Sequence, residues 1–559
     1  MRTRRISSIV LAALAASPAA HAAQIVPQSS GTILQQIPKP QQRQQALPEI
    51  QIQEGNGHVE KADDKVKIDV KALKITGSHL YSEDELIRVA HFKPGRYSLL
   101  QLRAMAALIT LKYRMDGYFV AHAILPAQTI KDSVVHIVVR KGVYDKITIK
   151  NATNLSDSLA KALLAGLNPG DAITVRPLEE RLLLLSDLPG VKVHSTLVPG
   201  SSAGSSDLTV NVKPGRRITG NIEADNEGNP YTGANRLGAT VYLNDPAGHG
   251  DQASLQVLTS SQGLNYGRAS YQVQVGRARI GAAYTKMQYW LNGSFASLNA
   301  FGTADIVSAY ANYPLIRTRY NNLNIAIDHD SRSFQDNQGA TSTFDGKHAD
   351  AWMTTLSGNE MDGLLGGGSS SYSLAWTSGE IAIGNAAALA NDVATTNTSG
   401  HYDKIGFTGS RVQSLKGAVS LSAAVHGQLA SKNLDVSEKM ELGGSGGVRA
   451  YPEGEAYGDQ GYVLNLEARD ALPKFSPLPG MFQLIGFVDT GTVTINQNLW
   501  AGATGANRRT LSGTGLGLDW STPGGFMVQT YLAHKLGNAA ATSSPDSMNR
   551  FWIQGSKFF

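Results

Sequence analysis

The chain has 559 residues, of which 58 are glycine, 17% are charged and none is cysteine. A typical soluble protein has about 25% charged residues and about 7% glycine, so this composition favours many strands joined by turns over a helical bundle. The lack of cysteine excludes disulfides, iron–sulfur clusters, thiolate zinc sites and cysteine nucleophiles. The length accommodates several ordinary domains, or one large barrel with accessory domains.

The N-terminus has the layout of a secretory signal peptide. Three arginines precede the apolar run 9–16, and the small-residue sequence Ala20-His21-Ala22 follows. We therefore predict residues 1–22 to be a signal peptide. Its removal takes away three positive charges and lowers the formal net charge from +5 to +2, which leaves no electrostatic reason to expect a nucleic-acid partner.

No later window reaches the ~20 apolar residues that a membrane-spanning helix requires. An exported chain that resides in a membrane must then be a closed β-barrel, because only helices and barrels satisfy their backbone groups in lipid. This combination points to the outer membrane of a Gram-negative bacterium and to outer-membrane lipid as a partner.

A glutamine- and proline-rich linker is predicted over residues 23–65. Residues 24–54 contain ten glutamines, a composition that cannot bury enough apolar surface to fold alone. Within this segment Ile33, Leu34 and Ile37 form one apolar face of a short helix over 32–37. Such a helix would be ordered only by docking elsewhere in the protein.

Two compact α+β units follow, over residues 66–141 and 142–215. The first reads as a strand over 66–75, a helix after a capping box at Ser82 and Glu85, a helix over 99–115, and strands over 119–125 and 134–139. The second repeats this order, with a strand over 146–150, helices over 156–167 and 177–188, and strands over 191–197 and 208–212. Nothing inside either unit indicates catalytic chemistry.

From residue 216 to 559 the pattern changes to two-residue alternation. Leu255 and Val257 alternate with glutamine and serine, as expected for strands with one face toward lipid and the other toward a polar lumen. About sixteen antiparallel strands fit this region, so the predicted fold is an all-β transmembrane barrel preceded by two α+β domains. Gly513, Gly515 and Gly517 alternate along one strand and should let another segment approach closely. The alternative interpretation is a soluble array of β-sandwiches.

This domain order resembles the TpsB family, the outer-membrane transporters of two-partner secretion, whose two α+β units are POTRA (polypeptide-transport-associated) domains. The turn at Leu125, Pro126 and Gln128 resembles the end of the first POTRA domain. The barrel begins with Asp225-Asn226, Tyr231-Thr232-Gly233 and Arg236, which are similar to the family's first hairpin in order and spacing.

The resemblance also implies a functional loop. Members of the family fold a long extracellular loop into the lumen, with a Val-Arg-Gly-Tyr tip. Here Val448, Arg449, Ala450 and Tyr451 form the tip of the loop 443–461, and Ala450 departs from the usual glycine. The family's partner motif Phe-x-Asp-x-Gly is supplied by Phe487, Asp489 and Gly491. A bidentate pair between Arg449 and Asp489 would then lock the loop to the barrel wall.

The resemblance implies a transporter that captures an unfolded secreted exoprotein in the periplasm and exports it without ATP, with the helix at Ile33, Leu34 and Ile37 in the pore. We expect a monomer with no cofactor, no metal and no catalytic residue. The nucleophile-elbow pattern at residues 443–447 lacks the strand-turn-helix context that this motif needs. The alternatives are an outer-membrane protein assembly factor of the same superfamily, and an enzyme or passive porin.

Overall fold

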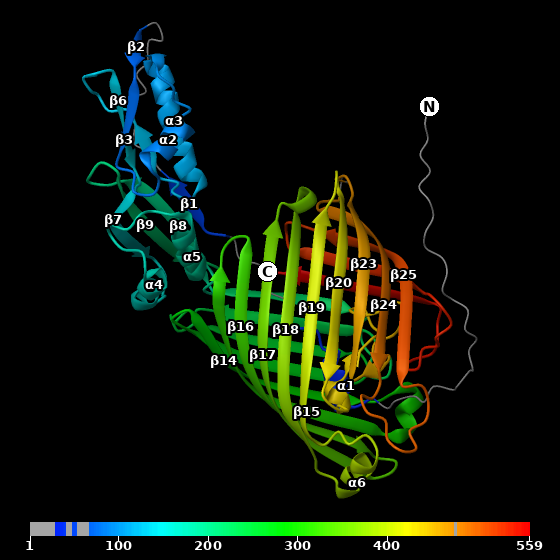
Figure 1. Ribbon diagram of the computed structural model, residues 1–559. Helices are drawn as coiled ribbons and strands as arrows, with labels where there is room; N and C mark the ends of the chain where they lie inside the picture. Colours follow the sequence, from blue (N-terminus) through cyan, green and yellow to red (C-terminus); the bar gives the residue numbers. More distant parts are fainter. Residues whose placement is uncertain (1–27, 41–46, 53–65, 475–477) are drawn as a thin grey trace, which may run out of the picture.

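The computed structural model describes residues 28–40, 47–52, 66–474 and 478–559. The predicted signal peptide lies outside the described residues, and so do residues 23–27, 41–46 and 53–65 of the predicted linker. Figure 1 shows an α+β arm, coloured blue to teal, next to one rim of a barrel whose strands run from green to red. Helix α6 lies at the opposite end of the barrel from the arm.

The first domain of the arm packs two helices on a small sheet with the order β3-β6-β5. Ser82 caps α2 by accepting a hydrogen bond from the backbone N–H of Glu85, and Ser98 and Gln101 form a reciprocal capping box at α3. The elements are β2 Lys67–Val70, β3 Ala72–Thr76, α2 Glu83–Val89, β4 Gly95–Ser98, α3 Leu99–Met115, β5 His122–Ile124 and β6 Val134–Arg140.

The second domain repeats this plan, with one addition that the sequence pattern does not predict. Strand β1, from the linker, pairs in parallel with β8 through the register Glu49 to His194 and Ile52 to Leu197, so the sheet order is β1-β8-β9-β7. The elements are β1 Glu49–Ile52, β7 Val143–Asn151, α4 Asp157–Leu164, α5 Val175–Ser186, β8 Val191–Pro199 and β9 Ser205–Pro214.

Sixteen antiparallel strands form the closed barrel, as predicted, and β10 closes it by pairing with β27. The strands are β10 Ile218–Asp225, β11 Arg236–Asn244, β12 Gln252–Ser260, β13 Leu264–Val275, β14 Ala278–Trp290, β15 Ala300–Arg317, β16 Asn321–Gln338, β17 Thr343–Asp362, β18 Gly368–Ile383, β19 Gly400–Ser414, β20 Val419–Ala430, β23 Gln460–Ala471, β24 Met481–Thr494, β25 Arg508–Ser521, β26 Phe526–Lys535 and β27 Asn549–Phe558.

Short elements lie in the loops and in the linker. They are α1 Ser30–Gln35, η1 Gly293–Leu298, η2 Leu364–Gly366, α6 Ala386–Ala394, η3 Val436–Glu438, β21 Met440–Glu441 and β22 Tyr457–Gly458. In Figure 1, α1 lies among the strands of the barrel, which are distant from it in the sequence. No helix in the described ranges is long and apolar enough to cross a membrane.

The two faces of the barrel wall differ in burial. On β24, Val488 points outward and is 46% exposed, whereas Phe487 and Asp489 on either side of it are buried on the inner face. Tryptophans and leucines such as Trp352, Trp376 and Leu374 are exposed on the outer face. This alternation gives an apolar belt outside and a polar lumen inside.

Ion pairs join the arm to the turns at the nearby rim of the barrel through α5 and the residue that follows it. Arg317 donates two hydrogen bonds of 2.7 Å to the carboxylate of Asp187, and Arg319 pairs with Glu179. Arg277 lies 2.5 Å from Glu180. Paired guanidinium and carboxylate groups of this geometry fix orientation as well as distance.

Candidate functional site

The loop between β20 and β23 enters the barrel and is buried along most of its length. At its tip Val448, Ala450 and Tyr451 are fully buried, and Arg449 is 4% exposed. Such burial of an arginine requires partners, because an isolated charge in a low-dielectric site is costly. The inner wall of the barrel supplies them.

Arg449 forms a bidentate pair with Asp489 on β24. Its Nε lies 2.9 Å from Asp489 Oδ2 and its Nη2 lies 2.8 Å from Oδ1, while the backbone N–H of Arg449 also donates to Oδ2. The third guanidinium nitrogen, Nη1, donates to Glu467 on β23 at 2.8 Å. Arg469 balances the second carboxylate by pairing with Glu467 at 2.6 Å. The structure thus brings together the two residues predicted to interact and adds Glu467, which the sequence did not reveal.

Aromatic rings complete the surroundings of Arg449. The guanidinium carbon lies 3.6 Å from the ring centroid of Phe487 and 5.0 Å from that of Tyr531. On β27, the indole N–H of Trp552 donates to the backbone carbonyl of Arg449 at 2.7 Å. Four strands, β23, β24, β26 and β27, therefore contact this one side chain or its backbone.

The backbone at Ala450 does not need the freedom of glycine, because Ala450 does not adopt a positive φ. Its methyl group instead packs on the bare backbone of Gly513, where an added Cβ would lie 2.5 Å from the Cβ of Ala450. Gly515 and Gly517 make similar room for the rings of Phe487 and Tyr531. The predicted close approach of another segment is confirmed at Gly513, whereas Gly515 and Gly517 accommodate rings of the adjacent strands β24 and β26.

Two further contacts hold the loop, one from Gly491 on the wall and one from Tyr451 at the tip. A Cβ at Gly491 would lie 3.0 Å from a methyl group of Leu442, so this glycine allows the loop to pack closely on the wall. Tyr451 donates a hydrogen bond to the carbonyl of Ala539, and the ammonium group of Lys535 lies 4.6 Å from its ring centroid.

The stem of the loop, residues 433–439, is held by a second set of ion pairs that the sequence analysis missed. Glu438 lies between Arg332 of β16, at 2.6 Å, and Lys404 of β19, at 2.8 Å. Asp435 pairs with Lys347 of β17 at 2.6 Å. Burial alone would raise the pKa of Glu438, but Lys404 and Arg332 stabilise the carboxylate and hold that pKa below its ordinary value.

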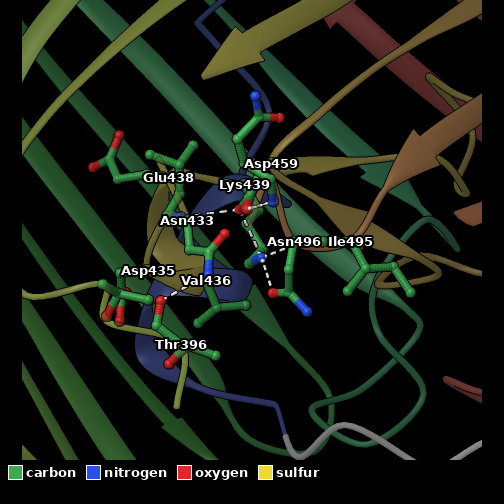
Figure 2. Close-up of polar contacts among 12 residues, drawn as sticks. Thr396, Asn433, Asp435, Val436, Glu438, Lys439, Asp459, Ile495 and Asn496 are labelled. Carbon is green, nitrogen blue, oxygen red and sulfur yellow. Dashed lines mark hydrogen bonds and ion pairs between the residues drawn. The ribbon is translucent and has the colours of Figure 1, made fainter. Parts of the chain in front are cut away.

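A third group of contacts closes the two ends of the loop against each other (Figure 2). The ammonium group of Lys439 lies 2.7 Å from Asp459 and also donates to the carbonyl of Ile495 and to Asn496. Asp459 is fully buried and accepts the backbone N–H of Leu434 as well. The stem is therefore tied both to its own far end and to the neighbouring loop.

Helix α1 lies inside the barrel, where the sequence analysis expected the amphipathic segment to dock. Ile33 is fully buried in a cluster with Met287, Phe334 and Leu434, and Leu34 and Ile37 pack against the same cluster. At the end of the helix, Arg236 donates to the carbonyl of Gln36 at 2.8 Å and pairs with Asp225.

The loop also contains a group of buried carboxyl groups near the end of α1. Burial raises the pKa of Glu441 and Glu453, and the neighbouring charge of Glu453 raises that of Glu441 further. Burial also raises the pKa of Glu227, in the loop after β10, to about 7. In the described part of the chain, no group of three or more histidine, aspartate or glutamate side chains is placed to hold a metal ion.

In the turn motif of the first arm domain, the side chain of Gln128 pairs with the backbone of β6 as a neighbouring strand would. The side-chain amide of Gln128 accepts the N–H of His136 and donates to its carbonyl, both at 2.8 Å. This pair of bonds continues the pairing along β6 beyond the end of β5, where the chain at Leu125 and Pro126 has left the sheet. The motif therefore stabilises the fold of the domain and does not form part of the lumen site.

A sixteen-stranded barrel with an N-terminal α+β arm and a loop locked into its lumen defines an outer-membrane polypeptide transporter or assembly protein. The family model for haemolysin secretion/activation proteins of the ShlB/FhaC/HecB type matches residues 204–520, more than half of the chain, and the model for ShlB-type POTRA domains matches residues 68–142. The chain belongs to this family of TpsB outer-membrane transporters. Its POTRA arm accordingly lies in the periplasm.

Known relatives agree with this assignment. The chain is 29% identical over 482 residues to the heme/hemopexin transporter protein HuxB of Haemophilus influenzae, a match that covers 85% of this chain and 84% of HuxB. The structure of CdiB from Escherichia coli superimposes with a TM-score of 0.66 at 18% identity, over 91% of this chain and 92% of CdiB.

The assembly-factor alternative has weaker support. BamA from Haemophilus ducreyi, lacking POTRA domains 1–3, superimposes with a TM-score of 0.54 at 14% identity and covers 88% of this chain and all of that one. A likeness at this identity shows a shared fold only. The family match therefore favours the transporter over the assembly factor.

Proposed function

We propose that this chain captures an unfolded secreted exoprotein in the periplasm through its POTRA arm and exports it through the barrel, without ATP and as a monomer. In the resting state α1 and the loop 443–461 close the lumen. The observation that carries this proposal is their joint burial inside one barrel, with Ile33 and Tyr451 both fully buried. A channel for a polypeptide has to remove both segments before it conducts.

Strand β8 supports the capture step. A parallel strand, β1, already lies along its edge over the four residues from His194 to Leu197. Main-chain pairing of this kind requires little side-chain specificity, so the same edge can hold an extended cargo segment once β1 leaves it. Folding of the cargo outside the cell then gives the export its direction.

We propose that Arg449 and Asp489 act as a latch that keeps the loop on the wall. All four side chains that contact the guanidinium, Asp489, Glu467, Phe487 and Tyr531, point into the lumen from β23, β24 and β26, so the latch organises the lumen and not the lipid-facing side of the wall. Loss of the latch should thus impair export without preventing insertion into the membrane.

The test of capture is deletion of residues 66–215. We expect export to be abolished while the barrel still inserts and remains heat-modifiable, because the strands from β10 onward contain all their own hydrogen-bond partners once the barrel closes. The measurement is cargo in the medium at equal abundance of the barrel in the membrane. Normal secretion by the deletion variant would refute the capture step and favour a passive porin.

A narrower test addresses the edge of β8. Gln51→Pro should weaken the pairing of β1, whereas Gln51→Ala keeps the backbone donor and serves as the matched control. The full-length proline variant should bind an extended fragment from the N-terminus of the cargo several-fold more tightly in a fluorescence-anisotropy titration. Equal affinity for both variants would mean that β1 does not compete with cargo.

A further inference from the structure

Helix α1 rests on the stem of the long loop as well as on the barrel wall. An added Cβ at Gly31 would lie 2.5 Å from the Cβ of Ser437 and 2.9 Å from its Cα, so the helix backbone packs directly on η3. The side-chain amide of Gln35 donates to the carbonyls of Val436, at 3.1 Å, and Ser437, at 2.6 Å. These contacts cover the flank of a helix of only six residues.

The opposite flank of α1 faces the wall. Ser30 donates to Asp336 of β16 through both its backbone N–H, at 2.8 Å, and its hydroxyl group, at 3.0 Å. Tyr289 of β14 also donates to Asp336, at 2.7 Å. The helix is therefore held between two surfaces, one on the rigid wall and the other on a loop.

Among the ion pairs that hold the stem, those of Glu438 are the ones that join the end of η3 itself to the barrel wall. The carboxylate of Glu438 is 2% exposed and meets two cations from strands that are far apart in the sequence, Arg332 and Lys404. The backbone carbonyl of Glu438 accepts two further hydrogen bonds, from Lys404 and Gln428, both at 2.9 Å. Figure 2 shows Val436 beside the blue ribbon of the N-terminal segment, with Glu438 and Lys439 on the same stem.

We infer that η3 is the seat of helix α1 and that Glu438 is the positioning residue that keeps this seat in place. The site differs from the latch at the tip of the loop, because its residues come from β16, β19 and β20, whereas Arg449 contacts β23, β24, β26 and β27. Displacement of the stem removes the acceptors of Gln35 and the packing surface of Gly31 together. Release of the stem therefore releases the helix.

This inference rests on the proposed role of α1 in closing the lumen, and the experiment separates the two. Planar-bilayer conductance is measured for the intact protein, for Glu438→Gln, for deletion of residues 24–54, and for the deletion combined with Glu438→Gln. Glu380→Gln, which removes a carboxylate from an exposed side chain of β18, is the matched control. Heat-modifiability confirms that each barrel has inserted.

We expect the deletion to raise conductance and Glu438→Gln to raise the frequency of open events several-fold, with no added effect of Glu438→Gln in the deletion variant. If the deletion leaves conductance unchanged, the proposal that α1 closes the lumen is wrong. If the deletion raises conductance but Glu438→Gln does not, the seat is wrong and closure by α1 stands. If Glu438→Gln raises conductance further in the deletion variant, Glu438 acts on the barrel without α1, and the inference is wrong.

A second pair of variants keeps the inference testable if Glu438→Gln does not insert. Gly31→Ala adds a methyl group where Ser437 leaves no room, and it should raise the frequency of open events. Ser437→Gly removes the opposing Cβ but leaves its Cα 2.9 Å away, and it should restore closure in part in the double variant. Equal conductance of Gly31→Ala and the intact protein would contradict a seat at η3.

Discussion

The tip and the stem of the long loop are both held by buried ion pairs, but with opposite polarity. At the tip the loop supplies the cation, Arg449, and the wall supplies the anions Asp489 and Glu467. At the stem the loop supplies anions, and the wall supplies cations from β16, β17 and β19. An exchange of the two ends would place like charges together, so the arrangement fixes the direction of the loop in the lumen.

The two ends also differ in what surrounds the charges. Arg449 is a single cation that lies between aromatic rings and serves two carboxylates, whereas the carboxylate of Glu438 at the stem lies between two cations, Arg332 and Lys404. Truncation of one partner in a fully buried pair leaves an uncompensated charge, which costs about 3–5 kcal/mol. The tip should accordingly respond more strongly than the stem to loss of a single side chain.

The largest effect is expected for Arg449→Ala. Loss of the guanidinium leaves Asp489 buried without its cation and leaves Glu467 with Arg469 alone, and export should fall by about tenfold or more at equal membrane abundance. Arg469→Ala, which removes a more exposed partner of Glu467, is the control. The double variant with Asp489→Asn should be less than additive, since the partners share one interaction. Additive losses would show that the two residues act separately.

An intermediate effect is expected when the tip is displaced without loss of its charge. Gly513→Ala introduces a methyl group against Ala450, and overpacking of this kind costs about 1–3 kcal/mol. Trypsin should then cut after Arg449 in outer-membrane vesicles. Ala450→Gly in the same chain should restore protection. Cleavage that persists in the double variant would place the strain elsewhere.

A smaller effect, confined to the stem, is expected for Lys347→Asp. The change places two carboxylates together at Asp435 and should expose Lys432 and Lys439 to trypsin while Arg449 stays protected. Asp435→Lys in the same chain re-forms the pair with its polarity reversed. Coupling energies of contacting charges are about 0.5–3 kcal/mol, so recovery should be partial. Cleavage after Arg449 in the single variant would show that the two ends are not independent.

The smallest effect is expected from pH, in the segment that joins tip and stem. The raised pKa values of Glu227, Glu441 and Glu453 mean that the packed loop binds more protons than the released loop between about pH 4.5 and 7. The stability of the packed loop should therefore fall as pH rises through this range. Hydrogen exchange of residues 441–457 measures it, and Glu453→Gln should flatten the profile. A stability of the packed loop that rises with pH would contradict the raised pKa values of these carboxyl groups.

Some of this organisation can be predicted from the sequence because it depends on local patterns. Two-residue alternation indicated the sixteen strands and placed Asp489 on the inner face, and the spacing of Ile33, Leu34 and Ile37 indicated a helix before its docking site was known. The helix over 99–115 was predicted at its observed bounds, with Gly117 marking its end.

The stem could not be predicted, because its partners meet only after the barrel has closed. Glu438 is 106 residues from Arg332 in sequence, and neither residue lies in a motif. Strand β1 was missed for a similar reason: four residues of a glutamine- and proline-rich linker become a strand only through the edge that β8 offers. Glu467 was missed because alternation gives the face of a residue but not its neighbour across the sheet.

The hydrogen bond from Trp552 to the backbone of Arg449 has a consequence for the order of events during biogenesis. β27 is the last strand of the barrel and pairs with β10, the first. The carbonyl of Arg449 thus gains its donor only when β27 is in register on β26, where Trp552 lies opposite Tyr531. Until this last strand is added, Asp489 and Glu467 can hold the guanidinium of Arg449, but its backbone carbonyl lacks the indole donor.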